Sequence, residues 1–139
     1  MKLRVFFLLC MIFVSVNAYA GEDAFIDALK NCSAYTSSDT MNINGVSANS
    51  YKQISGWQGD KCTYKETVNF SGNSICITCK FTKSQIEEIS TVADAYYTTL
   101  KYTKEQPDLS SVESLQNNPV AQVINKYLTD PSVCSMSGL

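Results

Sequence analysis

The chain has 139 residues, no histidine and a formal net charge of −2. The lack of histidine excludes the usual serine and cysteine catalytic triads and any histidine-based metal site. The mild acidity argues against nucleic acid as a partner, and the length predicts one globular domain.

Residues 1–20 have the three parts of a secretory signal. Two basic residues precede a mainly apolar stretch over 5–16, and Ala18-Tyr19-Ala20 forms a small-x-small cleavage site. The apolar stretch is shorter than the roughly 20 residues that a membrane helix needs. We therefore predict cleavage before Gly21 and a single domain over 21–139. This mature domain is expected in the periplasm or outside the cell, with no stable membrane span.

Cleavage at this site removes Lys2 and Arg4, and Arg4 is the only arginine of the chain. The net charge then changes from −2 to −4, and lysine alone supplies positive charge. Bidentate recognition of phosphate or carboxylate groups by arginine is therefore excluded for the mature protein.

The polarity patterns predict a helix, then strands, then further helices. Apolar residues recur at helical spacing over 24–36, and Ser37-Ser38-Asp39 is expected to end that helix. Extended segments are predicted over 40–46, 51–57, 61–70 and 75–81.

The segment over 61–81 is predicted to be a hairpin with one apolar and one polar face. Cys62, Tyr64 and Val68 share the apolar face, whereas the intervening lysines and threonines point to the other side. An antiparallel sheet that is covered on one side has this pattern. If Phe70 faces Ile75 across the turn, then Cys79 faces Glu66.

Capping boxes mark the later helices. Ser84 with Glu87 predicts one helix start, Ser110 with Glu113 a second, and Pro119 is suited to the first position of a third. The expected fold class is α+β: an N-terminal helix, an antiparallel β-meander of three to four strands, and C-terminal helices on one sheet face. Disulfides are expected to stabilise it.

Five of the six cysteines remain after cleavage, and exported proteins with several cysteines usually form disulfides. Cys32 lies on the apolar face of the first helix and can reach Cys79 or Cys62. We favour Cys79, because it lies well inside a strand. Cys76 points outward and Cys134 lies in a C-terminal tail, so Cys76–Cys134 is the second predicted bridge. Cys62 is then the leftover thiol, which we expect to be buried.

Cys76-Ile77-Thr78-Cys79 has the spacing of a thiol-redox motif. In redox proteins this motif opens a helix, which lowers the pKa of the attacking thiol. Here the alternation runs through the motif and places it in a strand. A structural role is therefore favoured, and neither a metal nor a cofactor is predicted.

Glu66 is the one acid on an otherwise apolar strand face. Burial there would raise its pKa and suit it to act as a general acid, whereas the structural alternatives are that it extends to solvent at the sheet edge or pairs with a lysine. Trp57, Tyr51 and Tyr64 are candidates for an aromatic patch that binds a partner or a sugar, and core packing is the alternative.

Together these features favour a small non-enzymatic binding or inhibitor-type protein. Its expected partner is a protein or another component of the cell envelope or the extracellular space. Two alternatives stay open: a carboxylate-dependent hydrolase centred on Glu66, and a thiol-redox accessory protein that uses Cys76 and Cys79.

Overall fold

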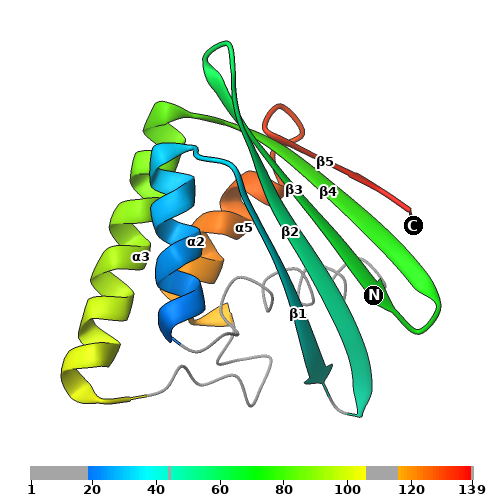
Figure 1. Ribbon diagram of the computed structural model, residues 1–139, viewed down its shortest axis with the longest axis horizontal. Coiled ribbons are helices and arrows are strands. Elements are labelled where there is room, and N and C mark those ends of the chain that lie inside the picture. The colour runs from blue at the N-terminus through cyan, green and yellow to red at the C-terminus, as the bar shows by residue number, and fades with distance from the viewer. Residues whose placement is uncertain (1–18, 44, 106–115, 139) are drawn as a thin grey trace.

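The computed structural model describes residues 19–43, 45–105 and 116–138. Its elements, in chain order, are α2 (Tyr19–Asn31), β1 (Tyr35–Ile43), β2 (Val46–Gln58), β3 (Lys61–Phe70), β4 (Asn73–Thr82), α3 (Lys83–Thr103), α5 (Pro119–Leu128) and β5 (Cys134–Ser137). The strands form one antiparallel sheet in the order β1-β2-β3-β4-β5, and the three helices lie on one side of it (Figure 1). The predicted α+β class is confirmed. The meander has five strands, and the fifth follows the last helix.

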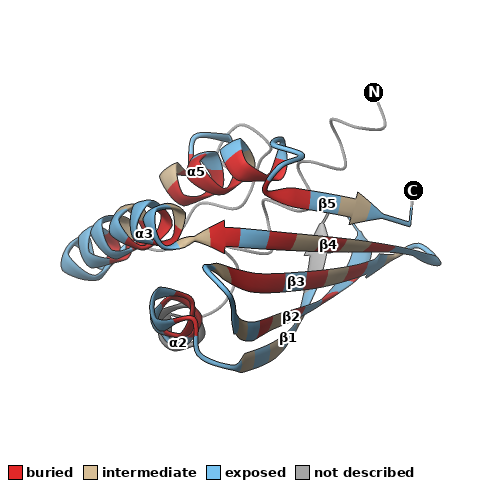
Figure 2. Ribbon diagram, turned by 90° about the horizontal axis from the view of Figure 1, so that it is seen from above, coloured by how far each residue is buried: buried red, intermediate tan, exposed pale blue. Residues whose placement is uncertain are grey.

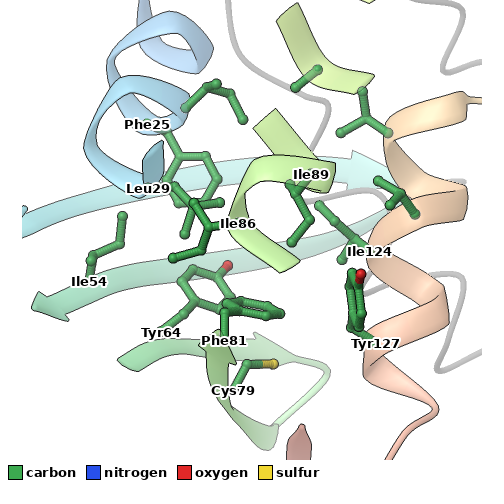
Figure 3. Close-up of a cluster of buried hydrophobic side chains, with 14 of the residues drawn as sticks. Phe25, Leu29, Ile54, Tyr64, Cys79, Phe81, Ile86, Ile89, Ile124 and Tyr127 are labelled. Carbon is green, nitrogen blue, oxygen red and sulfur yellow. The ribbon is translucent and has the colours of Figure 1, made fainter. Parts of the chain in front are cut away.

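The core fills the space between the helices and the sheet (Figure 3). The ring of Phe25 on α2 lies 5.8 Å from that of Tyr64, and the rings of Phe81 and Tyr127 are 5.9 Å apart. Ile89 of α3 is fully buried between these layers. None of the described helices is long and apolar enough to cross a membrane.

The first helix ends earlier than the sequence pattern predicts. Cys32 has a φ of 46°, and its N–H donates to the carbonyl oxygen of Leu29, which closes α2 after Asn31. Ser37-Ser38-Asp39 was wrongly predicted to be a break, because it lies inside β1. Its polar side chains carry little strand signal, and pairing with β2 places them in the sheet.

The hairpin of β3 and β4 has a tighter turn than predicted. Ser71 and Gly72 have φ values of 48° and 78°, so they form a two-residue turn with both central residues in the left-handed region. Phe70 therefore pairs with Asn73, and the predicted pairing with Ile75 was wrong. A shift by two residues leaves every side chain on its predicted face.

Helix caps explain where α3 and α5 begin. The capping box of α3 consists of Thr82 and Gln85, so the predicted start at Ser84 is two residues too late. For α5, Pro119 is the first residue as predicted. The side-chain oxygen of Asn118, Oδ1, accepts hydrogen bonds from the backbone N–H groups of Val120 and Ala121. The predicted helix start at 110–113 and residues 1–18 of the predicted signal lie outside the described residues.

Two disulfides fasten the fold, and both predicted pairings were wrong. Cys32 is bonded to Cys62, with 5.8 Å between their Cα atoms, and Cys79 is bonded to Cys134, with 4.1 Å between theirs. Cys76, and not Cys62, is the free cysteine among the described residues.

The positions of the strands explain both errors. The last residues of α2 lie beside the start of β3, so Cys32 meets Cys62 rather than a cysteine in the middle of β4. Cys134 does not lie in a loose tail, because it begins β5 directly opposite Cys79. Cys76 is on the opposite face of β4, where Cys134 cannot reach it.

Candidate functional site

Glu66 lies in the middle of β3 with its side chain toward the helices, and it is only 2% exposed. Its carboxylate accepts hydrogen bonds from Ser50 Oγ, at 2.8 Å, and from Tyr64 Oη, at 2.7 Å. Ser50 is on the neighbouring strand β2, and Tyr64 is two residues earlier on β3. Strand alternation therefore brings all three groups to one face.

A buried lysine faces this carboxylate. Lys52 of β2 is the ladder partner of Glu66 and is also 2% exposed. Its Nζ lies 3.9 Å from Oδ2 of Asp39 on β1 and 5.2 Å from the centre of the Phe25 ring, which also attracts a cation. We call Asp39, Ser50, Lys52, Tyr64 and Glu66 the buried charge cluster.

Burial raises the pKa of Glu66 above its ordinary value of 4.5, because the charged form loses its hydration. The positive charge of Lys52 opposes this rise, as do the hydrogen bonds from Tyr64 and Ser50. The negative charge of Asp39 adds to it. The raised pKa agrees with the sequence-based expectation, and the lysine partner corresponds to the second of the structural alternatives.

The buried charge cluster is closed to substrates. Glu66 borders a cavity of about 20 Å³ that is otherwise lined mainly by apolar side chains, among them Leu29 and Ile89. This volume suits about one water molecule. A general acid must come within hydrogen-bond reach of the group that it protonates, and the described residues leave no room for such a group here. The geometry therefore favours a structural role for Glu66.

The sequence interpretation missed Lys52, Ser50 and Asp39 as partners of Glu66. The signal for Lys52 was present, because it shares its strand parity with Ile54, which belongs to the core. A lysine on that face was not expected to be buried, since lysine is almost never fully buried unless it is paired.

The three aromatic candidates lie in different environments. Tyr64 is 6% exposed and belongs to the core, so it is not available to a partner. Trp57 is 45% exposed at the end of β2, opposite Cys62. Tyr51, in the middle of β2, is 44% exposed, so Trp57 and Tyr51 both offer surface for binding.

The side of the sheet that faces away from the helices is open and polar. Bands of exposed and buried residues alternate along its strands (Figure 2). We call this side the outer face; its residues include Thr36, Ser38, Thr40, Asn49, Tyr51, Gln53, Lys61, Thr63, Lys65, Thr67, Asn69, Ser74, Cys76, Thr78, Lys80, Ser135 and Ser137. Its one exposed large aromatic side chain is Tyr51, at 44%.

The two cysteines of the C-x-x-C motif are separated by the strand. Cys79 is on the inner face, fully buried and bonded to Cys134, whereas Cys76 is half-buried on the outer face. They therefore do not form a dithiol pair in this fold. The described part of the chain also contains no cluster of side chains suited to a metal ion.

Comparison with known proteins gives no match to a family model, to a curated protein or to a solved structure.

Proposed function

We propose that this chain is an exported, disulfide-stabilised, non-enzymatic protein that binds a component of the envelope or the extracellular space through its outer face. The observation that carries the proposal is the open outer face. The described helices lie on the opposite side of the sheet, and most outer-face side chains are exposed. A polar sheet face that no described element covers is available to a partner.

Export has two kinds of support. The pattern of residues 1–20 is typical of a secretory signal. The two disulfides are consistent with an oxidising compartment, since disulfides are rare in reducing cytosol.

The alternative functions gain no comparable support. A hydrolase centred on Glu66 needs access to a carboxyl group that is buried and already bonded to Ser50 and Tyr64. A redox role for Cys76 and Cys79 needs two neighbouring thiols, and Cys79 is bonded elsewhere.

Export is tested by the mass of the protein recovered from cells that express the full chain. We expect a form that begins at Gly21, carries two disulfides and is found outside the cytosol. A cytosolic protein that still begins at Met1 contradicts this part of the proposal.

Binding is tested by sedimenting the purified protein with isolated envelope material. The variant Thr67→Tyr with Thr78→Tyr adds bulk to the middle of the outer face without adding charge, and tyrosine is well tolerated in strands. The matched control is Thr91→Tyr with Thr98→Tyr, at exposed positions of α3. We expect the wild-type protein and the control to sediment with the envelope and the outer-face variant to stay in solution. If the outer-face variant and the control sediment with the envelope to the same extent, the assignment of binding to the outer face is overturned.

A further inference from the structure

Three lysines that are separate in sequence meet on the outer face. Lys61 and Lys65 are on β3, with Thr63 between them, and Lys80 on β4 is the ladder partner of Thr63. Lys65 and Lys80 are exposed, and Lys61 is half-buried. We call these three side chains the lysine cluster.

The charge of the lysine cluster is uncompensated on this face. The described residues contain ion pairs for Lys30, Lys52 and Lys126, but none for the three lysines of the cluster. Among the described side chains of the strands, the acids Asp39 and Glu66 point to the inner face. The outer face is thus positive in a protein whose predicted mature form is acidic overall.

A polar group without a partner lies within the lysine cluster. Thr63 is 4% exposed, and its hydroxyl oxygen has no hydrogen-bond partner in the described part of the chain. A buried hydroxyl usually has a partner, because leaving it unsatisfied is unfavourable. The hydroxyl is itself covered, so a ligand held between the lysines reaches it only if a neighbouring side chain moves aside.

A polar depression continues the same face toward the far end of β3. It has a volume of about 360 Å³, and its lining includes Asn49, Asn69 and Ser74, which are neighbours across three strands. From Lys61 to Asn69 the strand extends roughly 27 Å, at about 3.3 Å per residue. The face therefore offers a track of hydroxyl, amide and ammonium groups.

We infer that the lysine cluster and this depression bind an anionic polysaccharide; this inference rests on the proposed function of the outer face. Ammonium groups attract carboxylate or sulfate groups, and threonine, serine and asparagine side chains can hydrogen-bond to sugar hydroxyls. The centre of a protein–protein interface is usually apolar and depleted in lysine and serine, unlike this face. Two copies of the outer face would repel each other, because both are positive.

The direct test measures binding to polygalacturonate, with dextran as the neutral comparison polymer, by isothermal titration calorimetry at low salt. The test variant is Lys61→Gln, Lys65→Gln and Lys80→Gln together. The matched control, Lys30→Gln, Lys101→Gln and Lys126→Gln, makes the same change in net charge on the helices. Thermal unfolding verifies that both variants are folded, and the single variant Lys65→Gln serves if the triple variant is not.

We expect the wild-type protein to bind polygalacturonate and not dextran, with an affinity that falls as salt is added. The triple outer-face variant should lose about tenfold in affinity or more, since each surface ion pair contributes modestly. The control should keep the wild-type affinity. A smaller loss from the single variant Lys65→Gln supports the inference in the same way.

Several results overturn the inference. These are the absence of binding, an equal loss in the control, or tighter binding to duplex DNA or to vesicles of anionic phospholipid than to polygalacturonate. The envelope assay separates this inference from the proposed function. If the triple lysine variant still sediments with the envelope while Thr67→Tyr with Thr78→Tyr does not, the outer face keeps its role and its ligand is not recognised by charge.

Discussion

Replacing Lys52 with methionine removes the positive charge opposite Glu66 and keeps a long, flexible side chain in the core. The packing against Phe25 is largely preserved, because methionine makes favourable contacts with aromatic rings. What changes is the charge balance of the buried charge cluster. Glu66 is left with its two hydrogen bonds, from Ser50 and Tyr64, and with no buried cation nearby.

Removing one partner of a buried ion pair typically costs about 3–5 kcal/mol, because the remaining charge is uncompensated. A domain of this size has a free energy of unfolding of about 5–15 kcal/mol, so the loss should be large and easily measured. We expect this cost for Lys52→Met at about pH 8, where the Glu66 carboxyl group is more often ionised.

The same variant should be less costly in acid. The pKa of Glu66 is raised in the folded protein, so its contribution to stability is fully present below the ordinary value of 4.5 and is lost as the pH rises through the folded pKa. Lys52 opposes that rise, so its removal raises the pKa of Glu66 further. The destabilisation by Lys52→Met should therefore be clearly smaller at about pH 5 than at about pH 8.

Urea unfolding with the disulfides intact, followed by circular dichroism, gives the required free energies. The double variant Lys52→Met with Glu66→Gln removes both charges, keeps an oxygen that can accept a hydrogen bond from Ser50 or Tyr64, and should recover part of the loss at the higher pH. An equal effect of Lys52→Met at both pH values, or a double variant no more stable than the single one, would refute this account of the cluster.

Three further predictions concern the scaffold. Replacing Cys79 and Cys134 together with serine should lower the free energy of unfolding by about 4 kcal/mol, since the bridge spans a sequence separation of 55 residues; a loss below about 1 kcal/mol in urea unfolding contradicts this. Asn118→Ala should cost about 1 kcal/mol in thermal unfolding, because α5 loses its N-cap, and Asn118→Asp should cost less, because it keeps the cap acceptor although it loses the donor to Tyr96. Gly138→Ala would place a Cβ atom in steric conflict with the backbone carbonyl oxygen of Ser74, at a φ of 94°. Hydrogen exchange should therefore become faster in β5 and stay unchanged in α5.

The faces of the strands could be predicted from sequence, but their partners could not. The alternation of Cys62, Tyr64 and Val68 indicated the inner face of β3, and the structure confirms it. The register of the hairpin depended on whether Ser71 adopts a positive φ, which serine rarely does. Local patterns do not decide this, so the ladder was misplaced by two residues.

The disulfide pairings were wrong because the sequence patterns did not predict strand β5. β5 is four residues long and contains two serines, so its sequence gave no strand signal. Without β5, Cys134 was assigned to a tail and paired with the outward-pointing Cys76. Position within the sheet, rather than burial alone, decides which thiols meet.

The candidate sites were foreseen to different extents. The position of Glu66 on an apolar face and the direction of its pKa shift followed from the strand pattern. Its pairing with Lys52 required knowledge of the β2–β3 register. The lysine cluster combines Lys61 and Lys65 with a residue of the next strand, so it is visible only once the hairpin is formed.

The central claim is that the outer face is the binding surface, and threonine methyl groups report on it directly. A protein labelled at threonine methyl groups should be titrated with solubilised envelope material, or with polygalacturonate, and followed by NMR. We predict that the methyl signals of Thr67 and Thr78 on the outer face shift, while those of Thr91 and Thr98 on α3 stay in place. Shifts confined to the α3 threonines would contradict the claim.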